Sequence, residues 1–310
     1  MKKRILSGMR PTGKLHLGHL VGALENWVNL QEEYENFHLV ADWHVLTTDY
    51  KHTHRIRELT EEMVVDWLAA GIDPEKSVVF IQSQVKEHAE LFLILSMLVT
   101  LARLERNPTV KEQAKSLNIE EAGISFGHLG YPVLQAADIL LYRAHLVPVG
   151  EDQLPHIELT RELARRANNT WDNVFRLPQG KLTEFPRLPG PDGTRMSKSL
   201  GNVILLSDSP EQIRKVVMSA VTDPRKIRKN DPGDPDICTV FHWHRKFNPE
   251  ETDQIAADCR SGALGCVADK KRCADKIAEF LAPIREKRAA LLNDMDYVRD
   301  VIEQGNLKAQ

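Results

Sequence analysis

The first thirty residues place an apolar strand, a turn and the start of a helix in direct succession. Residues 4–6 form an apolar run that predicts a strand, and glycine and proline punctuate residues 8–13. From about His19 onward, apolar residues recur every three or four positions, which predicts a helix. His16 lies three residues before His19, with Gly18 between them. Such a loop presents unpaired N–H groups of a helix start and therefore suits a phosphate-bearing ligand.

Two other interpretations of this histidine pair stay open on the loop alone. The histidines could simply cap and solvate an ordinary turn between a strand and a helix. They could also bind zinc, but a second Cys or His pair does not lie nearby in the sequence.

Further apolar runs predict a parallel sheet. Residues 37–41, 78–81 and 146–149 have the length and composition of buried strands, and 55–70 has the periodicity of a helix. Strands that alternate with helices of this length indicate βαβ units, so we expect an α/β fold with a Rossmann-type, doubly wound parallel sheet. Ligands in such sheets bind at the carboxyl ends of the strands, which places the first loop and residues 42–44 on one edge.

The pattern also suggests two domains. Residues 1–206 are expected to form the catalytic domain, with a helical insertion at about 88–127. No strand pattern is recognisable in 207–310, which predicts a C-terminal helical domain. The basic cluster at 225–229 could meet a nucleic-acid backbone or be a solvated face, and the net charge of −3 excludes a global basic field.

Targeting signals are not evident. No apolar run reaches the length of a membrane span, and Gly8, Arg10 and Pro11 interrupt any signal-type apolar core. We therefore expect a cytoplasmic protein without a membrane partner. Its four cysteines do not form a disulfide framework pattern.

Two separated motifs resemble the signatures of class I aminoacyl-tRNA synthetases. His-Leu-Gly-His at 16–19 is similar to their HIGH element, and Arg-Met-Ser-Lys-Ser at 195–199 is similar to their KMSKS loop, with Arg in place of the first Lys. Four more segments resemble the bacterial-type tryptophanyl-tRNA synthetases, namely 41–44, 107–111, 130–140 and 147–153.

This resemblance implies an activity and its reactants. L-Tryptophan would be activated by ATP with Mg²⁺ to tryptophanyl-adenylate and transferred to the 3′ end of tRNA(Trp), by a homodimer whose helical domain reads the anticodon. The implied catalytic residues are His16, His19, Lys111, Arg195 and Lys198. The implied ATP-binding residues are Arg10, Thr12, Gly18, His19, Gly150, Asp152, Arg195, Met196, Ser197, Lys198 and Ser199.

The resemblance also implies a tryptophan pocket. A buried Asp138 would accept the single N–H of an indole, and its alternative role is an ion pair with a neighbour such as Arg143. The other implied pocket residues are Leu6, Val40, His44, Tyr131, Gln135 and Gln153. Gln135 stands where family members often carry Met.

The four cysteines fall in one segment. Some bacterial members of the family carry a [4Fe–4S] cluster there, which implies Cys238, Cys259 and Cys266 as ligands, with Asp269 or Cys273 as the fourth. The alternative is a set of reduced cysteines that pack as small apolar residues.

Two other functions remain open at this point. One is a tyrosyl-type synthetase with the same fold. The other is a synthetase-like binding or regulatory protein without charging activity.

Overall fold

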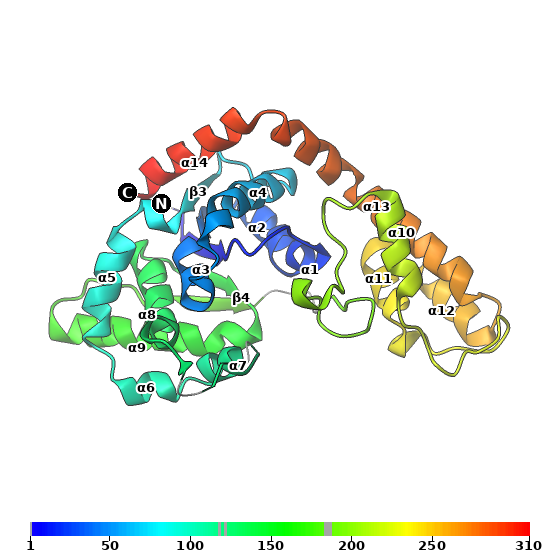
Figure 1. Ribbon diagram of the computed structural model, residues 1–310, viewed down its shortest axis with the longest axis horizontal. Coiled ribbons are helices and arrows are strands. Elements are labelled where there is room, and N and C mark those ends of the chain that lie inside the picture. The colour runs from blue at the N-terminus through cyan, green and yellow to red at the C-terminus, as the bar shows by residue number, and fades with distance from the viewer. Residues whose placement is uncertain (1, 117–118, 121–122, 183–187) are drawn as a thin grey trace. The chain divides into compact units, whose positions relative to one another are not determined.

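The computed structural model describes residues 2–116, 119–120, 123–182 and 188–310 (Figure 1). The chain forms two compact units. We call Met1–Gly13, Ala23–Glu184 and Asp294–Gln310 the sheet unit, and Lys14–Gly22 with Phe185–Asn293 the helical unit. These units do not follow the expected boundary at residue 206, because the end of the chain packs with the sheet and residues 14–22 pack with the helical unit.

The described part of the sheet unit contains a five-stranded parallel sheet. Its strand order is β3-β2-β1-β4-β5. The strands are β1 (Arg4–Met9), β2 (Glu35–Val40), β3 (Ser77–Ile81), β4 (Leu146–Val149) and β5 (Gln179–Leu182). In the central pairing, Leu6 lies opposite Phe37 and Met9 opposite Val40. The order reverses between β1 and β4, as in a doubly wound fold, which confirms the predicted fold class.

Strand β5, at one edge of the sheet, is the strand that the sequence did not predict. Its four residues read Gln-Gly-Lys-Leu and are mostly exposed, so the segment lacks an apolar pattern. It adds to the sheet by pairing with β4 over its whole length.

Helices surround the sheet and fill the rest of this unit. They are α2 (Glu25–Leu30), α3 (Asp42–Asp49), α4 (Ile56–Ala69), α5 (Glu87–Ser96), α6 (Leu101–Glu105), α7 (Pro108–Ser116), α8 (Phe126–Leu141), α9 (Leu154–Thr170) and α14 (Met295–Ala309). A core that includes Leu6, Phe37 and Phe80 lies between strands and helices, and a second core holds α5, α6, α8 and α9 together. The predicted helix 55–70 is α4, and Gly71 follows it with φ of 114°.

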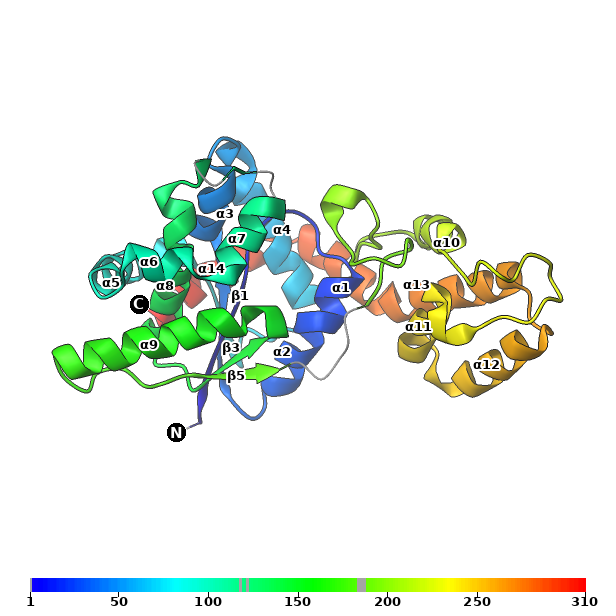
Figure 2. The same cartoon turned by 90° about the horizontal axis from the view of Figure 1, so that it is seen from below.

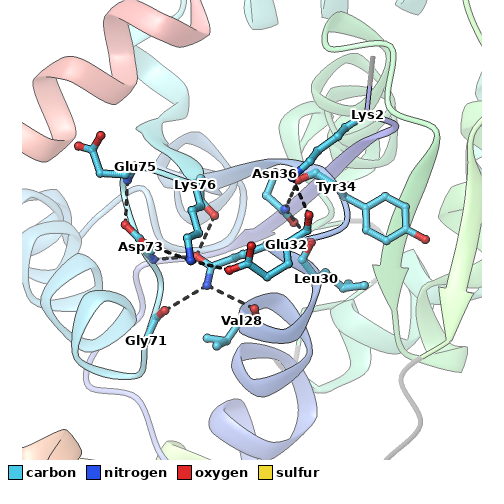
Figure 3. Close-up of polar contacts among 12 residues, drawn as sticks. Lys2, Val28, Leu30, Glu32, Tyr34, Asn36, Gly71, Asp73, Glu75 and Lys76 are labelled. Carbon is cyan, nitrogen blue, oxygen red and sulfur yellow. Dashed lines mark hydrogen bonds and ion pairs between the residues drawn. The ribbon is translucent and has the colours of Figure 1, made fainter.

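Polar contacts fix the amino ends of β2 and β3 (Figure 3). The buried Asn36 donates from Nδ2 to the carbonyl oxygens of Leu30 and Tyr34, at 3.1 and 2.9 Å. Lys76 Nζ contacts Glu32 Oε1 at 2.5 Å, but both side chains are well exposed. The buried amide therefore sets the turn into β2, and the exposed ion pair contributes little.

Helix α14 covers the β3 edge of the sheet. Asn306 Oδ1 accepts the N–H of Ile81 at 2.9 Å. A Cβ placed on Gly305 would lie 1.7 Å from the carbonyl oxygen of Val79, so only glycine permits this approach of helix to strand. The last helix thereby protects an edge that would otherwise present unpaired strand groups.

The helical unit is built from α1 (Leu17–His19), α10 (Pro210–Ser219), α11 (Thr239–Phe247), α12 (Thr252–Ser261) and α13 (Cys266–Leu292) (Figure 2). Helix α13 packs against both α10 and α11. Ser209 and Gln212 form a capping box at the start of α10. Within the described residues, no helix is both long enough and apolar enough to span a membrane.

Candidate active site

His16 and His19 cap the start of α1 reciprocally. The N–H of Gly18 donates to His16 Nδ1 at 3.1 Å, and the N–H of His16 donates to His19 Nδ1 at 3.3 Å. The two rings lie 3.8 Å apart, centroid to centroid. Because Nδ1 of a neutral imidazole can accept only when the proton sits on Nε2, both rings keep an Nε2–H donor.

The charge state of these rings agrees with this tautomer. Burial, together with the nearby cations Lys198 and Arg195, lowers the pKa of His16 to about 4. The pKa of His19 falls to about 3, mainly through burial and then through its neighbour His16 and the same cations. Both histidines are therefore neutral hydrogen-bond donors near pH 7.

The 195–199 segment is held by one buried side chain, Asn202. Its Oδ1 accepts the N–H of Ser197 at 2.7 Å, and its Nδ2 donates to the carbonyl oxygen of Arg195 at 3.0 Å. The same Nδ2 also donates to Asp192 and Thr194. Asn202 is 4% exposed. It thus fixes the backbone on both sides of Met196, which is itself buried. The side chain of Ser199 lies outside the described residues.

Within the helical unit, backbone hydrogen bonds join the 16–19 motif to residues 204–206, which follow the 195–199 motif in the chain. The N–H of Leu17 donates to the carbonyl oxygen of Ile204 at 2.9 Å, and the N–H of Leu206 donates to that of Leu15 at 3.0 Å. These bonds form a short antiparallel bridge beside His16. Segments about 180 residues apart in sequence are therefore neighbours here.

Gly18 makes this close packing feasible. A Cβ on it would lie 3.0 Å from the His16 ring and 3.6 Å from Cβ of Met196. The resemblance implied that Gly18 binds ATP. In the structure it already leaves room for the capping ring of His16 and for the 195–199 segment.

In the sheet unit, a buried carboxylate organises the predicted tryptophan pocket. Tyr131, Gln135 and Asp138 lie on one face of α8, at positions i, i+4 and i+7. Asp138 Oδ2 accepts from His44 Nε2 at 2.8 Å. His44 lies in the first turn of α3, which begins just after the carboxyl end of β2.

The other oxygen of Asp138 has two donors. Gln82 Nε2 donates to Oδ1 at 2.7 Å, and His88 Nδ1 lies 2.6 Å from the same atom. Burial raises the pKa of Asp138, but the hydrogen bonds from His44 and His88 outweigh it and hold the pKa at about 2. The carboxylate is therefore ionised although it is almost fully buried.

Tyr131 belongs to a second buried series of hydrogen-bonded side chains. Its Oη lies 3.1 Å from His156 Nε2, and His156 Nδ1 lies 3.5 Å from Asn107 Nδ2. Asn107 Oδ1 also accepts the N–H of Thr109, at the start of α7, which carries Lys111. Burial raises the pKa of Tyr131 to about 12, so its phenol stays neutral.

The remaining predicted residues lie at the strand ends of this unit. Leu6 and Val40 are buried on β1 and β2. Gly150, Asp152 and Gln153 form the turn after β4, where a Cβ on Gly150 would lie 2.7 Å from Asp152 Oδ1. Arg10 and Thr12 follow β1, and Arg10 donates to Thr48 Oγ1 at 3.5 Å.

Several site residues were missed by the sequence reasoning. They are Gln82, His88, Tyr142, His156 and Asn202. Gln82 follows β3 directly, so the rule that ligands meet at the carboxyl ends of strands could have found it. The others act through tertiary contacts that carry no local pattern.

Three of the four cysteines share a small cavity. Cys238, Cys259, Cys266 and Asp269 help to line a space of about 10 Å³, which holds about one water molecule. Burial raises the pKa of Cys238 to about 11. Among the described residues, no three His, Cys, Asp or Glu side chains converge on a point where a metal ion could bind.

The two candidates for the fourth cluster ligand lie in different surroundings. Cys273 is fully buried and directs its sulfur to the carbonyl oxygen of Val240, at 3.8 Å. Asp269 lines the cavity together with the three thiols, and its Oδ1 lies 3.1 Å from His244 Nε2. The space between these four side chains holds about one water molecule, so the donor set as arranged does not accommodate the [4Fe–4S] cluster that the resemblance implied.

A doubly wound parallel sheet of this strand order, with the 16–19 and 195–199 segments in one compact unit, is consistent with a class I synthetase architecture. More narrowly, the chain belongs to the class I tRNA synthetases of the W and Y family, whose model matches residues 1–282. This confirms the predicted resemblance.

Individual relatives agree over nearly the whole chain. A tryptophan–tRNA ligase of Thermotoga maritima is 52% identical over 310 residues, covering 99% of this chain and 94% of the relative. That of Aquifex aeolicus is 45% identical over 377 residues, with 99% and 95% covered. The tryptophanyl-tRNA synthetase of Campylobacter jejuni, solved with ADP and tryptophan, superposes with a TM-score of 0.89 at 32% identity, covering 99% of this chain and 94% of that one.

Proposed function

We propose that the chain is a tryptophan–tRNA ligase, which activates L-tryptophan with Mg²⁺-bound ATP and transfers it to tRNA(Trp). The observation that carries this proposal is the buried, ionised Asp138, which His44, Gln82 and His88 hold by hydrogen bonds in the sheet unit. An indole offers one N–H donor to such an acceptor. An amino acid without that donor leaves the carboxylate short of a hydrogen bond, which costs enough to discriminate sharply.

The same argument disfavours tyrosine as the substrate. A phenol hydroxyl can donate as well as accept, and a tyrosyl-type pocket would present a paired donor and acceptor for it. Asp138 presents an acceptor only. The curated relatives named above also support tryptophan.

Activation would proceed by attack of the tryptophan carboxylate on the α-phosphorus of ATP, with pyrophosphate leaving. This reaction needs positioning and charge stabilisation more than a general base. We assign to the Nε2–H groups of His16 and His19 the donation of hydrogen bonds to phosphate oxygens. We assign to Lys111, Arg195 and Lys198 the neutralisation of the departing pyrophosphate.

The other predicted residues keep their proposed roles. Those proposed for ATP are Arg10, Thr12, Gly18, Gly150, Asp152, Met196, Ser197 and Ser199. Those proposed for tryptophan, besides Asp138, are Leu6, Val40, His44, Tyr131, Gln135 and Gln153.

Two assays test the function. Exchange of labelled pyrophosphate into ATP should depend on tryptophan and not on tyrosine, and the protein should then charge tRNA(Trp). Exchange with tyrosine alone would refute the assignment. Exchange with tryptophan but no charging of tRNA would favour a synthetase-like regulatory role. Because tRNA charging serves the ribosome, we assign the protein to the cytoplasm.

We further propose a homodimer. Exposed apolar side chains gather along this part of the chain: Leu93 and Ile94 on α5, Met97 directly after it, and Leu101 on α6, with Met97 72% exposed. An apolar face of this kind is typical of a protein interface. Sedimentation equilibrium should give twice the chain mass of 35.2 kDa, and the mass of a single chain would contradict the proposal.

A further inference from the structure

We propose that His88 and Tyr142 are positioning residues that set tryptophan specificity by leaving Asp138 with one acceptor position for the indole N–H. This inference rests on the proposed activation of tryptophan at Asp138. Neither residue touches the indole in this account. They act through the carboxylate.

The first step is to count acceptor positions. An ionised carboxylate has about four lone-pair positions, two on each oxygen. Gln82 and His88 occupy both positions of Oδ1, and His44 occupies one on Oδ2. Among the hydrogen bonds of the described residues, these three leave a single position on Oδ2. The arrangement therefore matches one donor on the ligand.

The second step concerns the proton on His88. Since the Asp138 carboxylate can only accept, Nδ1 of His88 carries the proton of their 2.6 Å hydrogen bond. With the proton on Nδ1, Nε2 accepts the hydroxyl hydrogen of Tyr142, across 2.9 Å. Burial and the charge of Asp138 raise the pKa of Tyr142, so the phenol keeps the hydrogen that it donates. Tyr142 thus fixes the tautomer of His88, and His88 fixes Asp138.

The third step is that packing holds this relay rigidly. His88 is fully buried on α5, and Tyr142 directly follows α8, which carries Asp138. The Tyr142 ring stacks on Phe37 at 4.9 Å and packs against Phe80 at 5.1 Å, centroid to centroid. The relay therefore ties two packed helices to the strands β2 and β3, so the carboxylate has little freedom to turn its other oxygen to a ligand.

The test compares tryptophan with β-(3-benzothienyl)alanine, in which sulfur replaces the indole N–H. The readout is the ratio of kcat/KM for the two amino acids in pyrophosphate exchange. Tyr142→Phe removes only the hydroxyl and keeps the ring packing, and His88→Leu removes both hydrogen bonds. Each should lower the ratio about tenfold, because a buried hydrogen bond that fixes the acceptor is lost. His88→Asn keeps a donor at the Nδ1 position and should restore most of the ratio.

A matched control separates positioning from general destabilisation. Ser77→Ala deletes an equally buried hydroxyl at the start of β3, which donates to Gln31 Oε1, and this change should leave the ratio unchanged. An unchanged ratio in Tyr142→Phe would overturn the inference, even if both kcat/KM values fell together. Tyr142→Phe decides the matter if His88→Leu does not fold. Failure of the wild-type protein to exchange pyrophosphate with tryptophan would instead refute the proposed function.

Discussion

Replacing Asn202 by Ala tests how the 195–199 segment is held. Asn202 makes five hydrogen bonds that the structure resolves, through one buried amide. Three of them end on Asp192 and Thr194, which are exposed, so water replaces the lost partner at little cost. The other two end on the backbone, at the N–H of Ser197 and the carbonyl oxygen of Arg195.

The expected magnitude follows from those two backbone bonds. At about 1 kcal/mol each, their loss makes the ordered segment less favourable by about 2 kcal/mol, which is about 30-fold in population. Because we assign Arg195 and Lys198 to the pyrophosphate, this loss should fall on kcat for activation. The KM for tryptophan should stay within about twofold, because the proposed pocket residues belong to the sheet unit.

Steady-state pyrophosphate exchange, with tryptophan and ATP varied separately, measures both quantities. Asn202→Asp is the matched variant, since it keeps the side-chain size and the acceptor for the N–H of Ser197. It loses the Nδ2 donors and places a second carboxylate beside that of Asp192, which repels it. It should be at least as impaired as Asn202→Ala. A kcat within twofold of wild type in Asn202→Ala would refute the reasoning, and so would a rise in the KM for tryptophan at unchanged kcat.

Three further predictions concern stability and reactivity. Gly305→Ala should lower the unfolding free energy by about 2 kcal/mol or more, because the added Cβ would collide with a carbonyl oxygen of β3. In the control Gly22→Ala, the added Cβ meets no atom within 4 Å and should leave the unfolding free energy unchanged. Equal urea midpoints for the two variants would contradict this prediction. Burial lowers the pKa of His38 to about 3, so neutral His38 adds stability above pH 6.5 that is lost on acidification. Between pH 7.5 and 5, wild type should therefore lose about 2 kcal/mol more than His38→Phe in urea unfolding, and identical losses would exclude this role. A thiol reagent should react first with the partly exposed Cys259 and Cys266, and with the buried Cys238 and Cys273 only after unfolding. Equal reaction rates for all four would argue against the cysteine packing described above.

Periodicity and turn chemistry were enough to predict most of the sheet. The apolar runs at 37–41, 78–81 and 146–149 are strands β2, β3 and β4 to within two residues. Strand β5 escaped because its pairing with β4, and not its own sequence, makes it a strand. The division at residue 206 differs from the compact units for a similar reason. The contact of Gly305 with β3 is tertiary, and a helical pattern alone does not say what the helix covers.

The motifs of the candidate site could be predicted from the sequence, but the hydrogen bonds that hold the motif residues in place could not. Spacing and residue type led to His16 and Lys198, and the family resemblance led to Asp138. The pairing of His16 with His19 through their Nδ1 atoms depends on exact backbone geometry at a helix start, which a sequence pattern does not encode. The family resemblance suggested a cluster at the cysteines, and in the structure Cys273, one of the two candidates for the fourth ligand, packs into the core.

The most direct test of the central claim is the structure of the protein with bound tryptophan. The indole nitrogen should lie about 2.8–3.0 Å from Oδ2 of Asp138, with Oδ1 still bound by Gln82 and His88. An indole nitrogen that points to any other group, or that contacts Oδ1 after displacing His88, would contradict the account.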